Sequence, residues 1–268
     1  MPNELLLAAS GLLAGAFGAL LGLGGGILIV PILTLGFGVP LPAAVGTSLI
    51  SVIATSTGAA AINVRAGRAD VRLGITLAAG TVVGAVTGGI LAGFVPERIV
   101  AGLFALLLVY TGVTMVRGLF AGGRGEDPAA VDPSAPDGPS APAYRTRRLP
   151  TAIAGSFVGG NVSGLLGVGG GVVMVPLMHL VMGAPIKVAA ATSNFMIGLT
   201  AAAGAFAYLF RGDIDARLAA PVILGVAAGA ALGATVSGRI GTRPLVGLFV
   251  VVVAYVAVRM ALLALGAA

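Results

Sequence analysis

The chain has 268 residues, of which 58% are hydrophobic and only 9% are charged, and its mean hydropathy is +1.09. Soluble domains carry about 25% charged residues, so this composition excludes an ordinary soluble protein. The absence of cysteine excludes disulfides and thiol catalysis, and the net charge of +6 does not indicate nucleic-acid binding, because the basic residues lie in short loops beside apolar segments.

Five helical segments are predicted in each half of the chain. In the first half they lie at about 4–21, 26–37, 43–63, 71–93 and 97–118, and in the second at about 150–166, 171–182, 188–210, 216–238 and 243–265. Most carry an apolar run of about 17–25 residues, the length of a membrane-spanning helix. Their spacing is not the alternating pattern of a membrane β-barrel. The sequence therefore predicts an all-α polytopic membrane protein.

The two halves are joined by a Pro- and Ala-rich stretch at 119–148. This stretch has almost no apolar anchor, so we expect it to be a disordered linker. It separates a first transmembrane repeat over 1–118 from a second transmembrane repeat over 149–268.

The repeats are related by a duplication with a constant offset of 145 residues. The string GLGGGILIVP at 22–31 returns as GVGGGVVMVP at 167–176, and the Thr-Ser pair at 47–48 returns at 192–193. An odd number of segments per half would insert the halves in opposite orientations. If the loop 64–72 is cytoplasmic, eleven basic residues fall on the cytoplasmic side and three outside. We therefore expect an inverted repeat with both termini outside.

The glycine clusters are the candidate binding site. The short segments that follow them cover about half of a ~30 Å membrane core at 1.5 Å per residue. We expect each half to open with a re-entrant hairpin, although segments that cross fully would give the later helices the same orientation. At its tip, the start of the short helix presents free N–H groups to an anion. The predicted substrate-binding residues are Gly22, Gly24, Gly25, Gly26, Thr47, Ser48, Gly167, Gly169, Gly170, Gly171, Thr192, Ser193 and Asn194.

A plainer explanation of glycine in a membrane protein is close helix packing. Close packing suffices to explain most of the 44 glycines, but three consecutive glycines exceed what packing needs.

The acidic residues all fall in loops, the linker or helix ends. Proton- and sodium-driven pumps commonly use an intramembrane carboxylate, whereas anion efflux is favoured by the membrane potential alone. With one histidine and no cysteine, neither an enzyme nor a cofactor or metal site is expected.

The doubled G-x-G-G-G-x-x-x-V-P, followed by G-T-S-L at 46–49 and A-T-S-N-F at 191–195, resembles the TauE/SafE family of sulfite exporters. The resemblance covers nearly the whole chain outside 119–148. It implies export of sulfite, sulfoacetate or a related organosulfonate across the bacterial inner membrane. It places the two glycine clusters and the Thr-Ser pairs against this small anion.

Export by alternating access around a midplane site, with one half moving against the other, is the leading hypothesis. The alternatives are an anion channel or importer, and a membrane scaffold without transport. The partners expected are the sulfur-containing anion and the lipid bilayer, with no nucleic acid. Whether a homodimer forms is left open.

Overall fold

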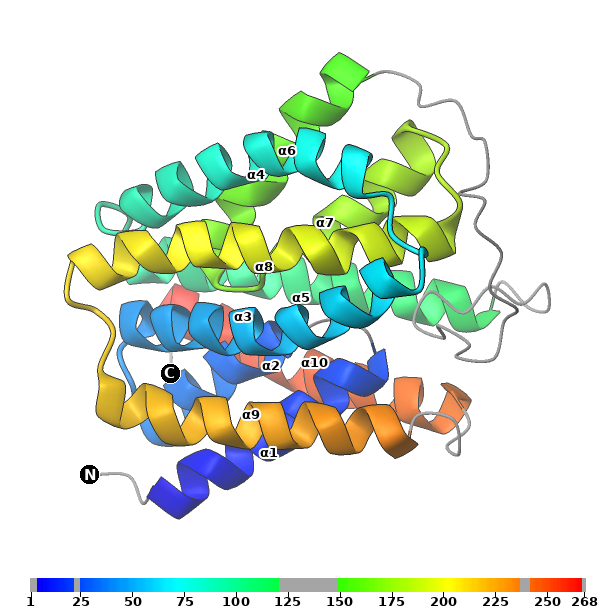
Figure 1. The fold of residues 1–268 in the computed structure, drawn as a ribbon. Coiled ribbons are helices and arrows are strands. Elements are labelled where there is room, and N and C mark those ends of the chain that lie inside the picture. Colours follow the sequence, from blue (N-terminus) through cyan, green and yellow to red (C-terminus); the bar gives the residue numbers. More distant parts are fainter. Residues whose placement is uncertain (1–3, 22–24, 121–148, 237–241, 267–268) are drawn as a thin grey trace.

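The computed structural model describes residues 4–21, 25–120, 149–236 and 242–266, which form helices and connecting turns and contain no strand (Figure 1). The helices of the first half are α1 (Glu4–Leu21), α2 (Gly26–Pro31), the π-helical η1 (Ile32–Gly36), α3 (Leu41–Arg65), α4 (Val71–Leu91) and α5 (Glu97–Phe120). Those of the second half are α6 (Leu149–Leu166), α7 (Gly171–Pro176), the π-helical η2 (Leu177–Val181), α8 (Ile186–Phe210), α9 (Ala216–Val236) and α10 (Thr242–Leu265). Each predicted segment is present within about two residues of its expected bounds.

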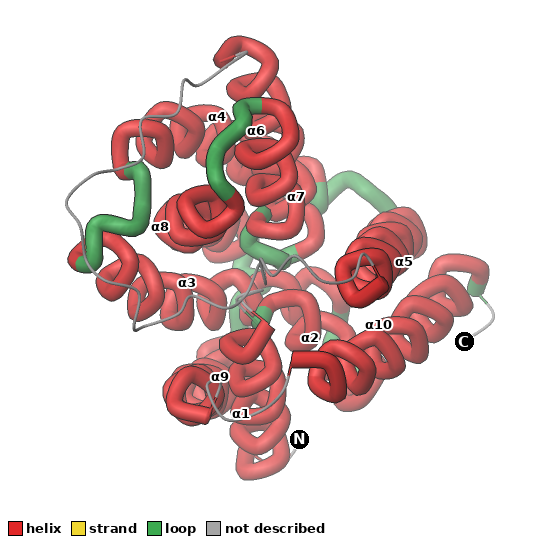
Figure 2. Tube along the Cα trace, turned by 90° about the vertical axis from the view of Figure 1, so that its right-hand side faces the viewer, coloured by secondary structure: helices red, strands yellow, loops and turns green. Residues whose placement is uncertain are grey.

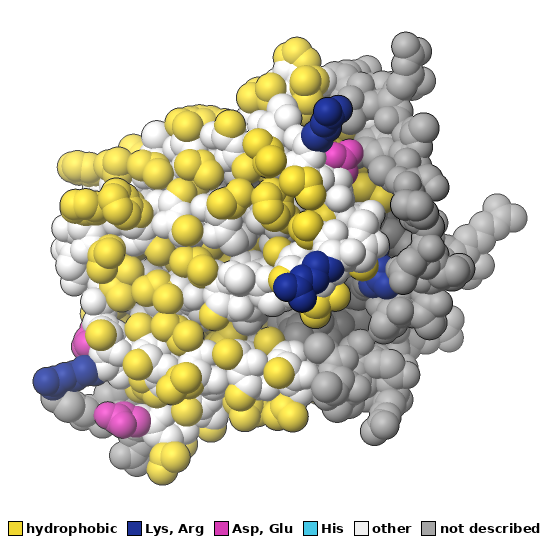
Figure 3. Space-filling model, viewed as in Figure 1, with side chains coloured by type: hydrophobic (Ala, Val, Ile, Leu, Met, Phe, Trp, Pro, Cys, Tyr) yellow, Lys and Arg dark blue, Asp and Glu magenta, His cyan; other side chains and the backbone are white. Residues whose placement is uncertain are grey.

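Seven of the described helices are long and apolar enough to cross a membrane: α3, α4, α5, α6, α8, α9 and α10. On the face shown in Figure 3, hydrophobic side chains cover the middle of the molecule and charged side chains lie near its two ends. The prediction of an all-α polytopic membrane protein is therefore confirmed. The predicted linker lies outside the described residues, apart from Leu119 and Phe120 at the end of α5.

The two halves exchange helices in their packing. Helix α1 of the first half packs along α9 of the second, and its equivalent α6 packs along α4. As a result, α1, α2, η1, α3 and α9 form one group, the first bundle, whereas α6, α7, η2, α8 and α4 form the second bundle (Figure 2). The bundles meet where α3 packs against α8, and α5 packs against α10 beside them.

Matching glycine stripes bring the exchanged helices into backbone contact. Gly80, Gly84 and Gly88 of α4 recur at 225, 229 and 233 of α9. A Cβ atom built on Gly84 would lie 2.1 Å from the Phe157 carbonyl oxygen of α6. One built on Gly229 would lie 2.0 Å from the Leu12 carbonyl oxygen of α1. Close packing therefore does explain these glycines.

Equivalent helices of the two halves run antiparallel where they meet. Along the α3–α8 interface, Gly46 approaches Tyr208, whereas Ser56 approaches Gly198. Along α5 and α10, Gly102 faces Ala264 and residue 112 faces residue 253. An inverted repeat requires this relation between equivalent helices.

The molecule has two ends, which we name after the acidic residues found there. The Glu97 end holds the start of α5 and, beside it, the end of α10, because Gly266 packs on Arg98. The loop between α8 and α9 lies at the same end, since Arg211 contacts Gly89 near the end of α4. The Asp70 end holds the loop between α3 and α4, which leads into the N-cap of α4.

The second hairpin packs on a core rich in methionine. Met174, Met178, Met182 and Met196 are all buried in one apolar cluster. The equivalent positions of the first half are Ile29, Leu33, Phe37 and Ser51. Methionine side chains adapt readily to changes in their surroundings, so we expect the core under the second hairpin (α6, α7 and η2) to be less stiff than the core under the first (α1, α2 and η1).

Candidate functional site at the two glycine tips

Each short helix begins at a glycine with a left-handed backbone. Gly25, the N-cap of α2, has a φ of 78°, and Gly170, the N-cap of α7, has a φ of 80°. Gly167 and Gly169 also have positive φ. Residues with a Cβ rarely adopt this conformation, so the clusters meet a backbone need that packing alone does not create. The predicted site residues Gly22 and Gly24 lie outside the described residues.

The first turn of each short helix has N–H groups for which the described residues supply no acceptor. The carbonyl oxygen of Gly25 accepts from the N–H groups of Leu28 and Ile29, and that of Gly170 accepts from residues 173 and 174. Within the described part of the chain, no acceptor is found for the N–H groups of residues 26 and 27 or of residues 171 and 172. These groups carry the positive end of the helix dipole.

The two tips touch each other in the middle of the molecule. A Cβ atom on Gly26 would lie 2.8 Å from the carbonyl oxygen of Gly167. Ser48 of α3 donates its hydroxyl hydrogen to this Gly167 oxygen at 2.8 Å, with the Gly26 oxygen as a second acceptor at 3.3 Å. One serine of the first bundle therefore ties together the tips of both bundles.

Two further serines, Ser163 and Ser193, lie beside the start of α7. A Cβ atom on Gly171 would lie 3.5 Å from Ser193 Oγ, and one on Gly170 would lie 3.7 Å from Ser163 Oγ. Both hydroxyls are buried, and neither has a partner among the described residues. A buried hydroxyl without a partner costs about 1–3 kcal/mol. The start of α7 thus gathers two N–H and two O–H donors that lack an acceptor among the described residues.

The threonines of the two Thr-Ser pairs are placed differently from the serines. Thr192 Oγ1 accepts a hydrogen bond of 2.9 Å from the backbone N–H of Asp70, so this hydroxyl contacts the start of α4 and not a glycine tip. Thr47 is buried and its hydroxyl has no partner in the described part of the structure. Asn194 is partly buried, and no described group hydrogen-bonds to its side chain. The structure therefore brings the serines, rather than Thr192, to the tips.

Ser163 was missed by the comparison of the two halves, because its equivalent is Gly18. The sequence did contain a signal. Ser163 precedes Gly167 by four residues, which places it in the last turn of α6, immediately before the second tip.

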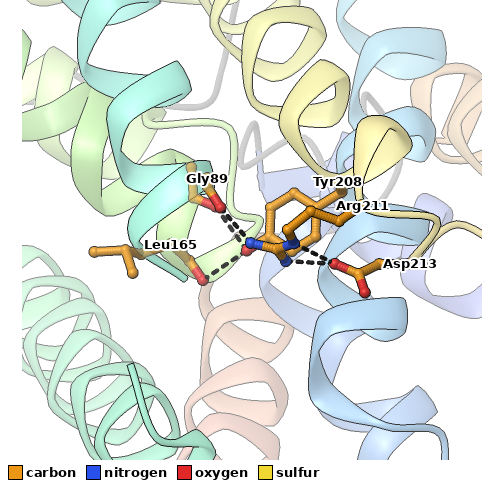
Figure 4. A network of polar contacts seen from close by, with 6 residues as sticks. Gly89, Leu165, Tyr208, Arg211 and Asp213 are labelled. Carbon is orange, nitrogen blue, oxygen red and sulfur yellow. Dashed lines mark hydrogen bonds and ion pairs between the residues drawn. The ribbon is translucent and has the colours of Figure 1, made fainter. Parts of the chain in front are cut away.

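A polar cluster that the sequence did not predict holds the backbone leading into the second tip. We call it the Tyr208 clamp (Figure 4). Tyr208 Oη donates to the carbonyl oxygens of Gly164 at 3.0 Å and Leu165 at 3.4 Å, at the end of α6. The Arg211 guanidinium lies over the Tyr208 ring, with Cζ 4.5 Å from the ring centroid.

The same guanidinium ties the clamp to a third helix. Arg211 Nη1 donates to the Gly89 carbonyl oxygen of α4 at 2.6 Å, and Nε donates to Asp213 Oδ2 at 2.6 Å within a salt bridge. The equivalent positions of the first half carry Asn63, Ala66 and Arg68, so these side chains do not recur there.

Among the described residues, carboxylates lie only at helix ends and in loops. Glu4 and Glu97 begin helices, Asp70 caps α4, and the other two lie in the loop between α8 and α9. The described residues contain no group of three or more His, Asp or Glu side chains that could hold a metal ion. The tips themselves therefore offer donors and partial positive charge and carry no carboxylate.

Comparisons with known proteins identify the family of the chain. The family model described as "Sulfite exporter TauE/SafE" matches residues 7–260. The chain belongs to the TauE/SafE family. It is 29% identical over 248 residues to the probable membrane transporter protein YunE of Bacillus subtilis, covering 90% of this chain and 91% of that protein.

Two further relatives carry the same kind of name. The chain is 30% identical to the probable membrane transporter protein MJ0441 of Methanocaldococcus jannaschii, covering 76% of this chain and 72% of the relative. It is 26% identical to the probable membrane transporter protein YdhB of Bacillus subtilis, covering 83% and 85%. No solved structure is significantly similar to the chain. This TauE/SafE member is thus a multi-pass membrane protein of a transporter family, and it is not an enzyme.

Proposed function

We propose that this TauE/SafE protein exports sulfite or a small organosulfonate and binds the anion at the start of α7. The observation that carries the proposal is the set of four donors around Gly170 and Gly171, namely two N–H groups and the hydroxyls of Ser163 and Ser193, without an acceptor among the described residues. The oxygens of a sulfite or sulfonate group would accept from these donors. A helix N-terminus attracts such an anion without any charged side chain.

The membrane potential supplies the driving force for export. With the cell interior negative, expulsion of one negative charge is favoured by about 2.3 kcal/mol per 100 mV. A carboxylate beside the tips would repel the anion, and all described carboxylates lie at helix ends or in loops. An electrogenic anion exporter therefore suits the charge distribution.

The halves are inverted in this proposal, with both termini outside a bacterial inner membrane. The antiparallel course of equivalent helices supports the inversion. The charges support the orientation. Among the described residues, the Asp70 end carries Arg65, Arg68, Arg72 and Arg117 with Asp70 as its carboxylate, whereas the Glu97 end carries Arg98, Arg211 and Arg217 with Glu4, Glu97, Asp213 and Asp215. The more basic Asp70 end is cytoplasmic by the positive-inside rule.

The bundles, and not the two halves of the sequence, are the bodies that move during alternating access. Each half is divided between both bundles, since α4 packs with α6 and α9 packs with α1. Backbone contact along the glycine stripes makes sliding within a bundle costly. The two bundles would instead rock across the α3–α8 interface and break the bond from Ser48 to Gly167.

Flux into proteoliposomes under an imposed potential tests the proposal. Vesicles containing the protein should accumulate radiolabelled sulfite or sulfoacetate, and Ser193→Ala and Ser163→Ala should each raise KM about tenfold, as expected for loss of a hydrogen bond to a charged group. Ser10→Ala is the matched control, because Ser10 only bonds the Leu7 carbonyl of its own helix.

The same assay separates the alternatives. A carrier shows saturable counterflow, whereas a channel shows none. Absence of any protein-dependent flux would contradict transport and favour the scaffold role. An unchanged KM in both serine variants would show that the anion does not bind at the start of α7.

A further inference from the structure

A small cavity lies between the two bundles at the Glu97 end. It measures about 10 Å³, room for about one water molecule. Leu41, Pro42 and Val45 of α3 line it from the first bundle, and Leu165 and Tyr208 line it from the second. The other lining residues, between α4 and α5 and at the start of α5, are Ala92, Val95, Glu97 and Val100. Separation of the bundles would widen this space.

Val45, which lines the cavity, also packs on the second glycine tip. A Cβ atom on Gly167 would lie 3.0 Å from Val45 Cγ1 and 3.1 Å from the Val45 carbonyl oxygen. Ser48, three residues further along α3, holds the Gly167 oxygen at 2.8 Å. Val45 is 1% exposed. It therefore stands between the cavity and the point where the two tips meet.

The wall opposite α3 is braced by the Tyr208 clamp. Tyr208 belongs to α8, the carbonyls of Gly164 and Leu165 belong to α6, and the Gly89 carbonyl bound by Arg211 belongs to α4. All three helices are part of the second bundle. When the bundles separate, this wall moves as one body and α3 leaves it.

We propose that this cavity is the vestibule through which the anion passes at the Glu97 end, with Val45 as its gate and Tyr208 as the positioning residue that holds the second tip behind the gate. The proposal rests on the proposed function for the nature of the anion. At the equivalent positions of the repeat, Ala190 replaces Val45 and Asn63 replaces Tyr208. The two ends of the path therefore differ, with a bulky, braced gate at one end only.

Single cysteines test the vestibule, because the chain has none of its own. Val45→Cys is reconstituted and treated from either side with the membrane-impermeant anion (2-sulfonatoethyl) methanethiosulfonate, and modification is read as a mass shift. Glu97→Cys at the mouth is the accessible reference, and Leu77→Cys, fully buried within the second bundle, is the inaccessible one. Val45→Cys should react from the Glu97 side, more slowly than Glu97→Cys and faster than Leu77→Cys.

Removal of the tyrosine hydroxyl tests the positioning role. Tyr208→Phe keeps the ring under Arg211 but loses the bonds to the end of α6, so it should raise the modification rate of Val45→Cys about fivefold. The rate at Ala190→Cys should stay unchanged. Tyr255→Phe, on an exposed face, is the matched control. An unchanged rate in Tyr208→Phe would remove the positioning role.

The vestibule is overturned if Val45→Cys reacts only from the Asp70 side, or fails to react while Glu97→Cys does. Leu41→Cys, which lines the same cavity, repeats the test if Val45→Cys does not fold. Modification does not depend on flux. If Val45→Cys reacts but the protein transports no sulfonate, the proposed function is wrong and the vestibule stands. If the protein transports sulfonate but Val45→Cys is not modified, only the vestibule is wrong.

Discussion

Ser48 donates a hydrogen bond to the Gly167 carbonyl at 2.8 Å, whereas its equivalent Ser193 has no partner within the described structure. Both serines follow a threonine at the same position of the repeat, and both are fully buried. One serine therefore holds the two tips together, and the other leaves its hydroxyl free beside the start of α7. The equivalent serines of the two halves therefore make different hydrogen bonds in this structure.

The two serines should respond oppositely to removal of the hydroxyl. Ser48→Ala should lower the unfolding free energy by about 1 kcal/mol, because a satisfied buried bond is lost. Ser193→Ala should leave it unchanged or slightly raised, because an unsatisfied group is removed. Thermal unfolding in detergent without substrate measures both. Equal destabilisation by the two variants would contradict the asymmetry.

The left-handed caps should not tolerate a side chain. Gly25→Ala and Gly170→Ala should each cost about 1–2 kcal/mol of stability, because an L-residue is strained at a φ near 80°. Gly36→Ala is the control, since a Cβ there meets open space and its φ is not positive. If Gly36→Ala is as damaging as the cap variants, the strain argument fails.

The glycine stripes should set the assembly of the bundles. Gly84→Leu and Gly229→Leu would push a side chain into the backbone of the partner helix, where a Cβ alone comes within about 2 Å. We expect little monodisperse protein from either variant by size-exclusion chromatography. Gly58→Leu, which meets nothing within 4 Å, should purify like the unaltered chain.

The second hairpin should be the more mobile of the two. All six residues of α2 are buried, whereas only Met174 is buried in α7, and four of the nine buried residues in the core around α7 are methionine. Hydrogen exchange should therefore be faster in residues 171–181 than in residues 26–36. Equal protection of the two segments would mean that the methionine core is as stiff as its aliphatic counterpart.

Much of the architecture could be predicted from the sequence. Apolar length located the helices, and glycine repetition located the two helix starts, because both are local consequences of chain chemistry. The exchange of α4 and α9 could not be predicted, since a glycine stripe shows that a helix packs closely without showing which helix it meets. Only the fold revealed that α4 lies against α6.

At the site, the repeat offset identified Ser48 and Ser193 but also selected Thr192, which serves the start of α4. Adjacent residues on a helix point about 100° apart, so only one member of each pair can face a tip. Ser163, Tyr208 and Arg211 have no matching residue in the first half. A comparison of the two halves finds only residues that recur, so it cannot find residues that are present in one half alone.

The exchange of α4 and α9 has a consequence for how this protein is made. When the first half has been synthesised, α4 has not met α6 and α1 has not met α9. The glycine stripes of α4 and the mating face of α1 then have no partner within the nascent chain. Residues 1–118 therefore stay structurally unfinished in the bilayer until α9 emerges from the ribosome, more than 200 residues into the chain. Folding of the first half therefore depends on synthesis of the last quarter of the sequence. A chain truncated before α9 should remain an incompletely folded insertion intermediate that quality-control proteases degrade.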